Sequence, residues 1–404
     1  MLQKNFLKIW LVLFWGWVAF PAVNFLVPET QWWKNYFYIF VLLPWLLLLP
    51  SNFKKREVWL NPIFLVSVLL ISYLMLTSLW SSSEKLYFLF YLKQVIYIIA
   101  YLSAGALLIE RFPHLLDYTF KAIMLAGSIS IACTIVVYIQ MRVPHGLSDA
   151  GVLQRLEGVG MLVNPLVAAQ NYGVLCLISL FYALNKAVSP FQKKILLLLS
   201  LVSFIVVIWT RSRGPSLYLP FSILLLIMFS RRAVIAKALK YFGGFVVACA
   251  GVLFLTPGLR SIIFNRSFEL SLSSIDLRVK IWTSLISEAI QSPFFGVGAR
   301  KHLDLEIGSR IFQNGHSIWV ETFYYGGFIG LALLIVSYFV FTMKAYQFRK
   351  ESILLSWFVF GTLAISSNGE NILSRPDWQW VVLWVPVAFI CAFHNSFEKK
   401  QQIN

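Results

Sequence analysis

The stretch that decides the fold is ILLLLSLVSFIVVIW, residues 195–209. Apart from Ser200 and Ser203 it is apolar throughout, and comparable apolar blocks recur along the chain. An α-helix rises 1.5 Å per residue, so about 20 apolar residues are enough to cross ~30 Å of hydrocarbon. Blocks of this kind indicate helices that span a membrane.

The composition excludes a soluble domain. Of 404 residues, 59% are hydrophobic and only 13% are charged, with a mean hydropathy of +0.75. Soluble domains carry about 25% charged residues, enough to cover a surface that faces water. The net charge of +17 would suggest nucleic acid in a soluble protein. In a membrane protein it is first explained by Lys and Arg collecting in cytoplasmic loops, and no nucleic-acid partner is expected.

We therefore predict an all-α integral membrane protein, forming a single polytopic domain over residues 1–404. The first apolar run is too long for a signal peptide and lacks a small-residue cleavage site, so it is kept as a span. About twelve transmembrane helices are expected, near residues 9–27, 36–50, 58–80, 86–109, 122–141, 161–185, 195–210, 216–230, 241–256, 318–342, 353–368 and 379–395.

The distribution of positive charge predicts the orientation. With the N-terminus in the cytoplasm and the spans alternating, every inside segment holds at least two Lys or Arg residues. The short outside loops near 28–35 and 81–85 hold one each. Both the N-terminus and the C-terminus are therefore expected to be cytoplasmic.

Two outside segments carry positive charge that this rule does not explain. One is the short loop Arg211-Ser212-Arg213, and the other is the long loop over residues 257–317. Arg and Lys outnumber the acids in that long loop. An anionic ligand on the outer face is the simplest reason for the excess.

The long outside loop is expected to contain a short amphipathic helix. Asp276 is placed to cap a helix over Leu277–Gln291, which Pro293 would stop. Its apolar stripe comprises Ile281, Trp282, Leu285, Ile286 and Ala289. Arg278 precedes Ile281 by three residues, so it shares the apolar face and would lie at the level of lipid headgroups.

Three residues on the outer side are candidates for chemistry. Arg213 and Arg278 each offer a guanidinium fork that matches phosphate oxygens, and His316 titrates near neutral pH. Each also has an alternative interpretation. Arg213 could anchor the chain to lipid headgroups, Arg278 could snorkel from an interfacial helix, and His316 could cap the tenth span.

Weaker candidates surround these three. Glu321, just inside the tenth span, is a possible acidic partner of His316, while Arg142 and Arg155 could line an acceptor site. The sequence assigns no role to Arg211. Asp304 and Glu306 form a lone acidic pair that is interpreted as solvated, so no metal site is predicted. Gly326 and Gly330 are spaced for close helix packing.

These residues resemble a known family, the bacterial O-antigen ligases and their relatives. The resemblance runs from the seventh to the tenth predicted span and includes the long late outer loop. The motifs are Thr210-Arg211-Ser212-Arg213-Gly214, Arg278 preceding Trp282, Gly296-Val297-Gly298, Asn314-Gly315-His316-Ser317 and the glycines Gly326, Gly327 and Gly330.

The resemblance implies an inverting, metal-independent glycosyltransferase of the bacterial inner membrane. It would move a glycan from undecaprenyl diphosphate to a hydroxyl of lipid A core on the periplasmic face, with no cofactor. Arg213 and Arg278 would bind the diphosphate, and His316 would lie at the reacting centre. A growing glycan or a protein hydroxyl remains an alternative acceptor, and a polyprenyl-lipid or solute transporter is the alternative from another class.

Overall fold

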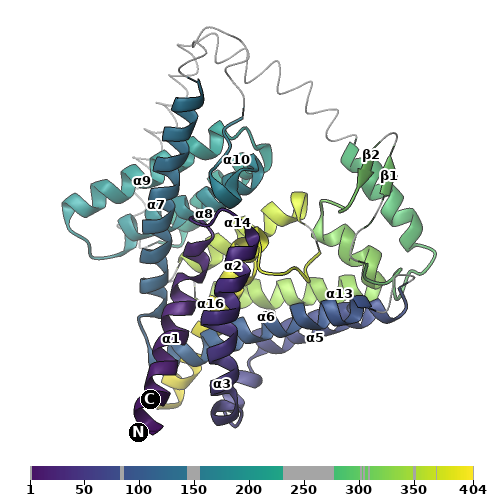
Figure 1. Cartoon of the computed structure of the whole chain (residues 1–404), viewed down its shortest axis with the longest axis horizontal. Coiled ribbons are helices and arrows are strands. Elements are labelled where there is room, and N and C mark those ends of the chain that lie inside the picture. Colours follow the sequence, from purple (N-terminus) through teal and green to yellow (C-terminus); the bar gives the residue numbers. More distant parts are fainter. Residues whose placement is uncertain are drawn as a thin grey trace.

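The computed structural model describes residues 2–81, 86–142, 155–230, 277–300, 303, 305–307, 310–348, 352–369 and 371–403. Within them the chain is built almost wholly from helices (Figure 1). The α-helices are α1 (Leu2–Val23), α2 (Thr30–Phe37), α3 (Leu43–Asn52), α4 (Arg56–Trp59), α5 (Pro62–Leu76), α6 (Leu86–Arg111), α7 (Leu115–Arg142), α8 (Pro165–Asn185), α9 (Pro190–Trp209), α10 (Arg213–Met228), α13 (Ile318–Gln347), α14 (Ser352–Asn368), α15 (Trp378–Val382) and α16 (Trp384–Ile403).

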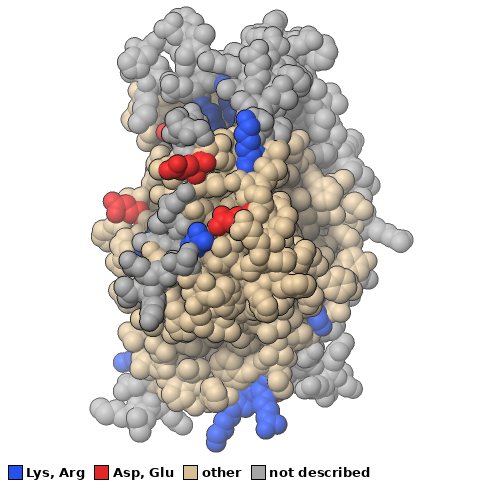
Figure 2. Space-filling view, turned by 90° about the vertical axis from the view of Figure 1, so that its right-hand side faces the viewer, with Lys and Arg blue, Asp and Glu red and all other residues tan. Residues whose placement is uncertain are grey.

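The prediction of an all-α multi-pass membrane protein is confirmed. Eight described helices are long and apolar enough to cross a membrane, and α10 and α14 are shorter apolar helices. Every predicted span except 241–256, which lies outside the described residues, falls on described helical segments. Figure 2 shows one face on which the charged side chains gather in the upper and lower parts, with a broad uncharged band between them.

Three features depart from the predicted row of simple spans. The second span combines α2 and α3 through a π-helical segment, Tyr38–Leu42. The span α13 is broken at Gly327. The long outer loop also contains an antiparallel hairpin of β1 (Leu305–Ile307) and β2 (Arg310–Phe312), which the sequence analysis did not predict.

The predicted amphipathic helix is present over residues 277–289, followed by turns. Ile281, Leu285 and Ala289 are buried, as the apolar stripe predicts. On the same stripe, Trp282 is half-buried and Ile286 is exposed. The cap proposed for Asp276 lies outside the described residues.

The packing brings distant parts of the sequence together. α10 packs on α14, α5 on α13, and α6 on α16. The two ends of the chain lie near each other, at the lower left of Figure 1. The pairing of α10 with α14 matters for the site, because it places the start of one helix beside the end of the other.

Candidate functional site

The turn between α9 and α10 holds the first candidate arginine. Arg211 has φ 54°, in the left-handed region that residues other than glycine rarely adopt. The hydroxyl of Thr210 donates to the Val207 carbonyl (2.7 Å) and accepts from the Ser212 backbone N–H (3.2 Å). These bonds fix the tight turn, so Arg213 begins α10 at a set position.

Arg155 braces the same turn from another part of the chain. Its Nε donates to the Thr210 carbonyl and its Nη2 donates to the Ser212 hydroxyl, both at 3.0 Å. Burial lowers the pKa of Arg155, and the charges of Arg213 and Arg211 lower it further. The sequence placed Arg155 at an acceptor site, whereas the structure shows it joined to the turn that carries Arg213. The side chain of Arg142, at the end of α7, lies outside the described residues.

Arg278 lies in the first turn of the helix over 277–289 and is partly buried. Burial is the main cause that lowers the pKa of this guanidinium. The charge of Arg213 lowers it further, while Tyr218 acts in the opposite direction. Among the described residues, no carboxylate forms an ion pair with Arg278. The partly buried Arg278 therefore feels the positive charge of Arg213, an arrangement suited to binding an anion.

The loop before α13 presents His316 with φ 51°, a second strained residue. The indole Nε1 of Trp282 donates to the Gly315 carbonyl at 2.9 Å, and the Gly315 N–H donates to the Glu321 carboxylate. A Cβ on Gly315 would lie 2.8 Å from the Leu285 side chain. A larger residue at position 315 would therefore require the Leu285 and Glu321 side chains to shift.

The surroundings of His316 favour its neutral form. Burial lowers the pKa of the imidazole, and the neighbouring charge of Arg278 lowers it further. A side-chain hydrogen bond with Asn368 opposes these effects. An imidazole whose pKa lies below 6.5 is mostly neutral at pH 7 and can accept a proton. Arg278 is thus electrostatically coupled to both Arg213 and His316.

The end of α14 contributes residues that the sequence analysis missed. Asn368 bonds His316, and the hydroxyl of Ser366 accepts a hydrogen bond from the Trp319 indole at 2.7 Å. A Cβ on Gly214 would lie 3.3 Å from the Ser367 hydroxyl. The available signal was the polar run Ser366-Ser367-Asn368-Gly369, which closes an apolar span on the predicted outer side.

Glu321 is 2% exposed, in the first turn of α13. Its described hydrogen bond holds the Gly315 backbone, next to His316. Glu321 therefore shapes the loop that carries the imidazole. A direct partnership with the imidazole stays a prediction.

A break in α13 fixes how the helix over 277–289 lies against it. Gly327 has φ 60° and ψ −157°, which are not helical values. The Phe328 N–H donates to the Pro293 carbonyl at 2.7 Å, outside the helix. A Cβ on Gly327 would lie 2.4 Å from the Phe294 carbonyl oxygen, so a larger residue has no room.

The Gly296-Val297-Gly298 motif completes this junction. The Val297 N–H donates to the Tyr324 carbonyl at 2.9 Å, and the Gly298 N–H donates to the Tyr325 carbonyl at 3.1 Å. Gly296 and Gly298 have φ values of 71° and 90°. Gly296, Gly298 and Gly327 thus join the chain after the Arg278 helix to the span that follows His316. Gly326 and Gly330, which the sequence assigned to close helix packing, lie against Tyr73 and Leu74 of α5.

No group of three or more His, Cys, Asp or Glu side chains is placed to hold a metal ion within the part of the chain that the structure describes. Of the acidic pair in the sequence, Asp304 lies outside the described residues. Glu306 lies in β1.

Comparison with known proteins gives two matches. The sequence model of a family described as "O-Antigen ligase" matches residues 198–335, which include Arg213, Arg278 and His316. A protein of Pseudomonas aeruginosa named "O-antigen ligase" is 27% identical over 388 residues. That alignment covers 93% of this chain and 89% of the relative, so the similarity extends over nearly the whole length.

Proposed function

We propose, from its membership of the O-antigen ligase family, that this chain transfers a glycan from undecaprenyl diphosphate to a hydroxyl of lipid A core. The chain is an O-antigen ligase-type membrane enzyme. The donor, the acceptor and the periplasmic location of the reaction belong to the proposal. So does placement in the bacterial inner membrane with cytoplasmic termini, which the distribution of positive charge supports.

One observation carries the proposal. The charge of Arg278 lowers the pKa of His316, and the charge of Arg213 lowers the pKa of Arg278. These residues come from three separate elements: the start of α10, the helix over 277–289 and the loop before α13. In the proposal, the two guanidiniums bind the diphosphate and the imidazole, whose lowered pKa favours the neutral form, accepts the proton. A transfer that releases a diphosphate and deprotonates a hydroxyl needs both groups.

The reaction follows from these roles. The acceptor hydroxyl oxygen attacks the anomeric carbon of the glycan while the bond from that carbon to the diphosphate oxygen breaks. The proton of the hydroxyl passes to His316, and undecaprenyl diphosphate leaves with the bonding electrons. Attack from the face opposite the leaving group inverts the anomeric centre.

Arg213 and Arg278 stabilise the negative charge that grows on the diphosphate. Donors already fixed at a partly dry site need little rearrangement during the reaction, and a single one contributes about 3–4 kcal/mol. A general base contributes typically 10²- to 10⁴-fold in rate. Because the guanidiniums supply the positive charge, the proposal includes no metal ion.

The other arginines have supporting roles. Arg155 positions the turn that carries Arg213, through its bonds to Thr210 and Ser212. Arg211 adds positive charge beside Arg155. We keep Arg142, with Arg155, as a candidate for the acceptor side, since both come from the predicted outer loop between α7 and α8.

The test is transfer from a defined undecaprenyl-diphosphate glycan to purified lipid A core, with and without EDTA. We expect glycosylated lipid A core and free undecaprenyl diphosphate in equal amounts, an inverted anomeric linkage by NMR, and no effect of EDTA. Growth of the donor glycan without use of lipid A core would indicate a polymerase instead. Movement of the intact donor across vesicles without bond cleavage would indicate a transporter.

A further inference from the structure

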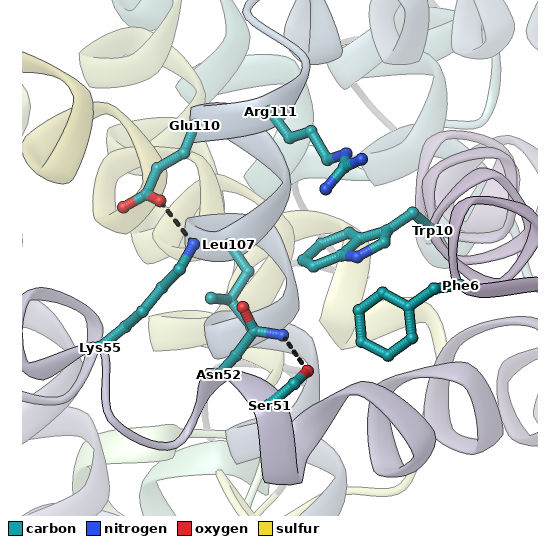
Figure 3. Close-up of a pocket in the computed structure, with 8 residues that line it drawn as sticks. All are labelled: Phe6, Trp10, Ser51, Asn52, Lys55, Leu107, Glu110 and Arg111. Carbon is teal, nitrogen blue, oxygen red and sulfur yellow. Dashed lines mark hydrogen bonds and ion pairs between the residues drawn. The ribbon is translucent and has the colours of Figure 1, made fainter. Parts of the chain in front are cut away.

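A cavity of about 380 Å³ lies between the start of α1, the end of α3 and the end of α6 (Figure 3). The residues that line it are distant in sequence from those of the site above. This volume lies within the range of small-molecule sites, ~300–1,000 Å³. All three segments fall on the predicted cytoplasmic side. The residues that matter most in its lining are Phe6, Trp10, Asn52, Lys55, Glu110 and Arg111.

The cavity carries a positive charge that its own acid does not neutralise. The Lys55 ammonium pairs with the Glu110 carboxylate at 2.9 Å. Glu110 is largely buried, so this pair balances its charge. The Arg111 guanidinium instead lies over the Trp10 ring, 5.2 Å from its centroid (Figure 3). No described carboxylate pairs with Arg111, so its hydrogen-bond donors remain for a ligand.

Among the other polar groups of the cavity, the Asn52 side-chain amide is already used, because it donates to the Leu48 carbonyl at 2.9 Å and to the Ser51 hydroxyl at 3.0 Å. The buried indole Nε1 of Trp10 has no acceptor among the described residues. A guanidinium that lies over an indole ring is already partly ordered, so it loses little freedom when it binds a phosphate with two parallel bonds.

Exposed apolar side chains adjoin the polar lining. Leu7 and Leu11 lie on α1 beside Phe6, and Phe53 follows α3 directly; Phe53 is 66% exposed. In a membrane protein such side chains contact acyl chains. A polar cavity at the end of a bundle, next to apolar side chains, fits a ligand with a charged head and hydrocarbon tails. It does not favour a free anion.

We propose that this cavity binds the phosphate of an anionic phospholipid from the cytoplasmic leaflet. Arg111 donates to the phosphate oxygens through its fork, with Lys55 as a neighbouring cation. Basic pockets between spans on the cytoplasmic side are a known means of holding lipid headgroups. The lipid would tie α1, α3 and α6 together, and its binding would stabilise the fold by mass action.

The test measures binding of phosphatidylglycerol to the purified full-length chain in a neutral detergent, by native mass spectrometry and by the thermal unfolding midpoint. We expect binding and a raised midpoint with phosphatidylglycerol. Phosphatidylcholine and inorganic phosphate, at equal concentration, should each have much smaller effects. Stabilisation by inorganic phosphate equal to that by phosphatidylglycerol would overturn the proposal and indicate a site for a free anion.

The Arg111→Gln variant should bind phosphatidylglycerol roughly tenfold to a hundredfold more weakly, because hydrogen bonds to a charged group are lost. Lys194→Gln is the matched control: it removes one exposed positive charge from α9, on the same predicted side but outside the cavity. Unchanged affinity in Arg111→Gln, or an equal loss in Lys194→Gln, would contradict the proposal.

If Arg111→Gln does not fold, Arg111→Lys provides the same test. Lys keeps the positive charge but lacks the flat fork. We expect it to fold and to bind phosphatidylglycerol more weakly than the unchanged chain. Full affinity in Arg111→Lys would show that Arg111 makes no directed contact with the phosphate, and the proposed site would be wrong.

Discussion

Replacing Arg278 by Gln is the perturbation that best separates a functional arginine from a structural one. Arg278 is partly buried, has no described carboxylate partner and lies near the like charge of Arg213. Removing one fixed donor to a growing negative charge costs about 3–4 kcal/mol, or a 10²- to 10³-fold loss of kcat. Removing it also relieves repulsion from Arg213, so the free energy of unfolding should stay equal or rise.

The assay is glycan transfer from undecaprenyl diphosphate by purified protein, with the thermal unfolding midpoint measured on the same samples. Arg278→Lys keeps the charge without the fork, so its kcat should lie between those of Arg278→Gln and the unchanged chain. Lys280→Gln is the matched control, because it removes a charge two residues away on an exposed position of the same helix. The reasoning is refuted if Arg278→Gln keeps its rate within about threefold, or if it loses stability along with its rate.

Three further predictions concern the loop and the helix that follows it. Because the pKa of His316 is lowered from 6.5 and its neutral form accepts the proton, kcat should be constant above that pKa and fall as the pH drops through it. His316→Gln should lose this fall at acidic pH and should be about 10²- to 10⁴-fold slower; if the fall remains, another group titrates. Gly327→Ala should lower the free energy of unfolding by ~1–3 kcal/mol, since φ 60° is strained for alanine and the added Cβ would lie 2.4 Å from a carbonyl oxygen. In Gly330→Ala the added Cβ would lie 3.2 Å from its nearest neighbour, so thermal unfolding should show a smaller loss of stability; equal losses would contradict the break in α13 at Gly327. Glu321→Ala should cost about 1–3 kcal/mol by leaving the Gly315 N–H without an acceptor, whereas Glu321→Gln should fold normally, and a denaturant titration that finds both variants equally stable would count against that bond.

The spans were predictable because apolar length is a local property of the sequence. Residues 195–209 form a helix in hydrocarbon whatever their neighbours are. The break at Gly327 was not predictable in this way. It depends on carbonyls at Pro293 and Phe294, from another segment, meeting the backbone of α13. Only the packed structure shows which glycine of the Gly326, Gly327 and Gly330 set leaves the helical conformation.

The candidate site was predictable to the extent that it depends on charge. Arg213, Arg278 and His316 stood out because positive charge and a histidine on the outer side had no topological reason. Asn368 and Tyr218 carry no net charge at neutral pH, so nothing in the sequence separated them from other polar residues. Their contacts with His316 and Arg278 depend on the packing of α10 against α14.

Arg155 illustrates the same limit in another way. Its charge suggested a ligand-binding role, which stays a prediction, and the structure adds a second role through its bonds to Thr210 and Ser212. Charge alone does not distinguish a residue that binds an anion from one that braces the backbone beside it. The distinction requires the hydrogen-bond partners, which come from parts of the chain more than fifty residues apart.

The most direct measurement of the central claim is a cryo-EM structure of the purified protein with undecaprenyl diphosphate bound. The account predicts diphosphate density within hydrogen-bond reach of the Arg213 and Arg278 guanidiniums, with the His316 imidazole facing the space beyond the terminal phosphate in which the anomeric carbon and the attacking hydroxyl would lie. Diphosphate density away from these three side chains, with the protein still active in transfer, would contradict it.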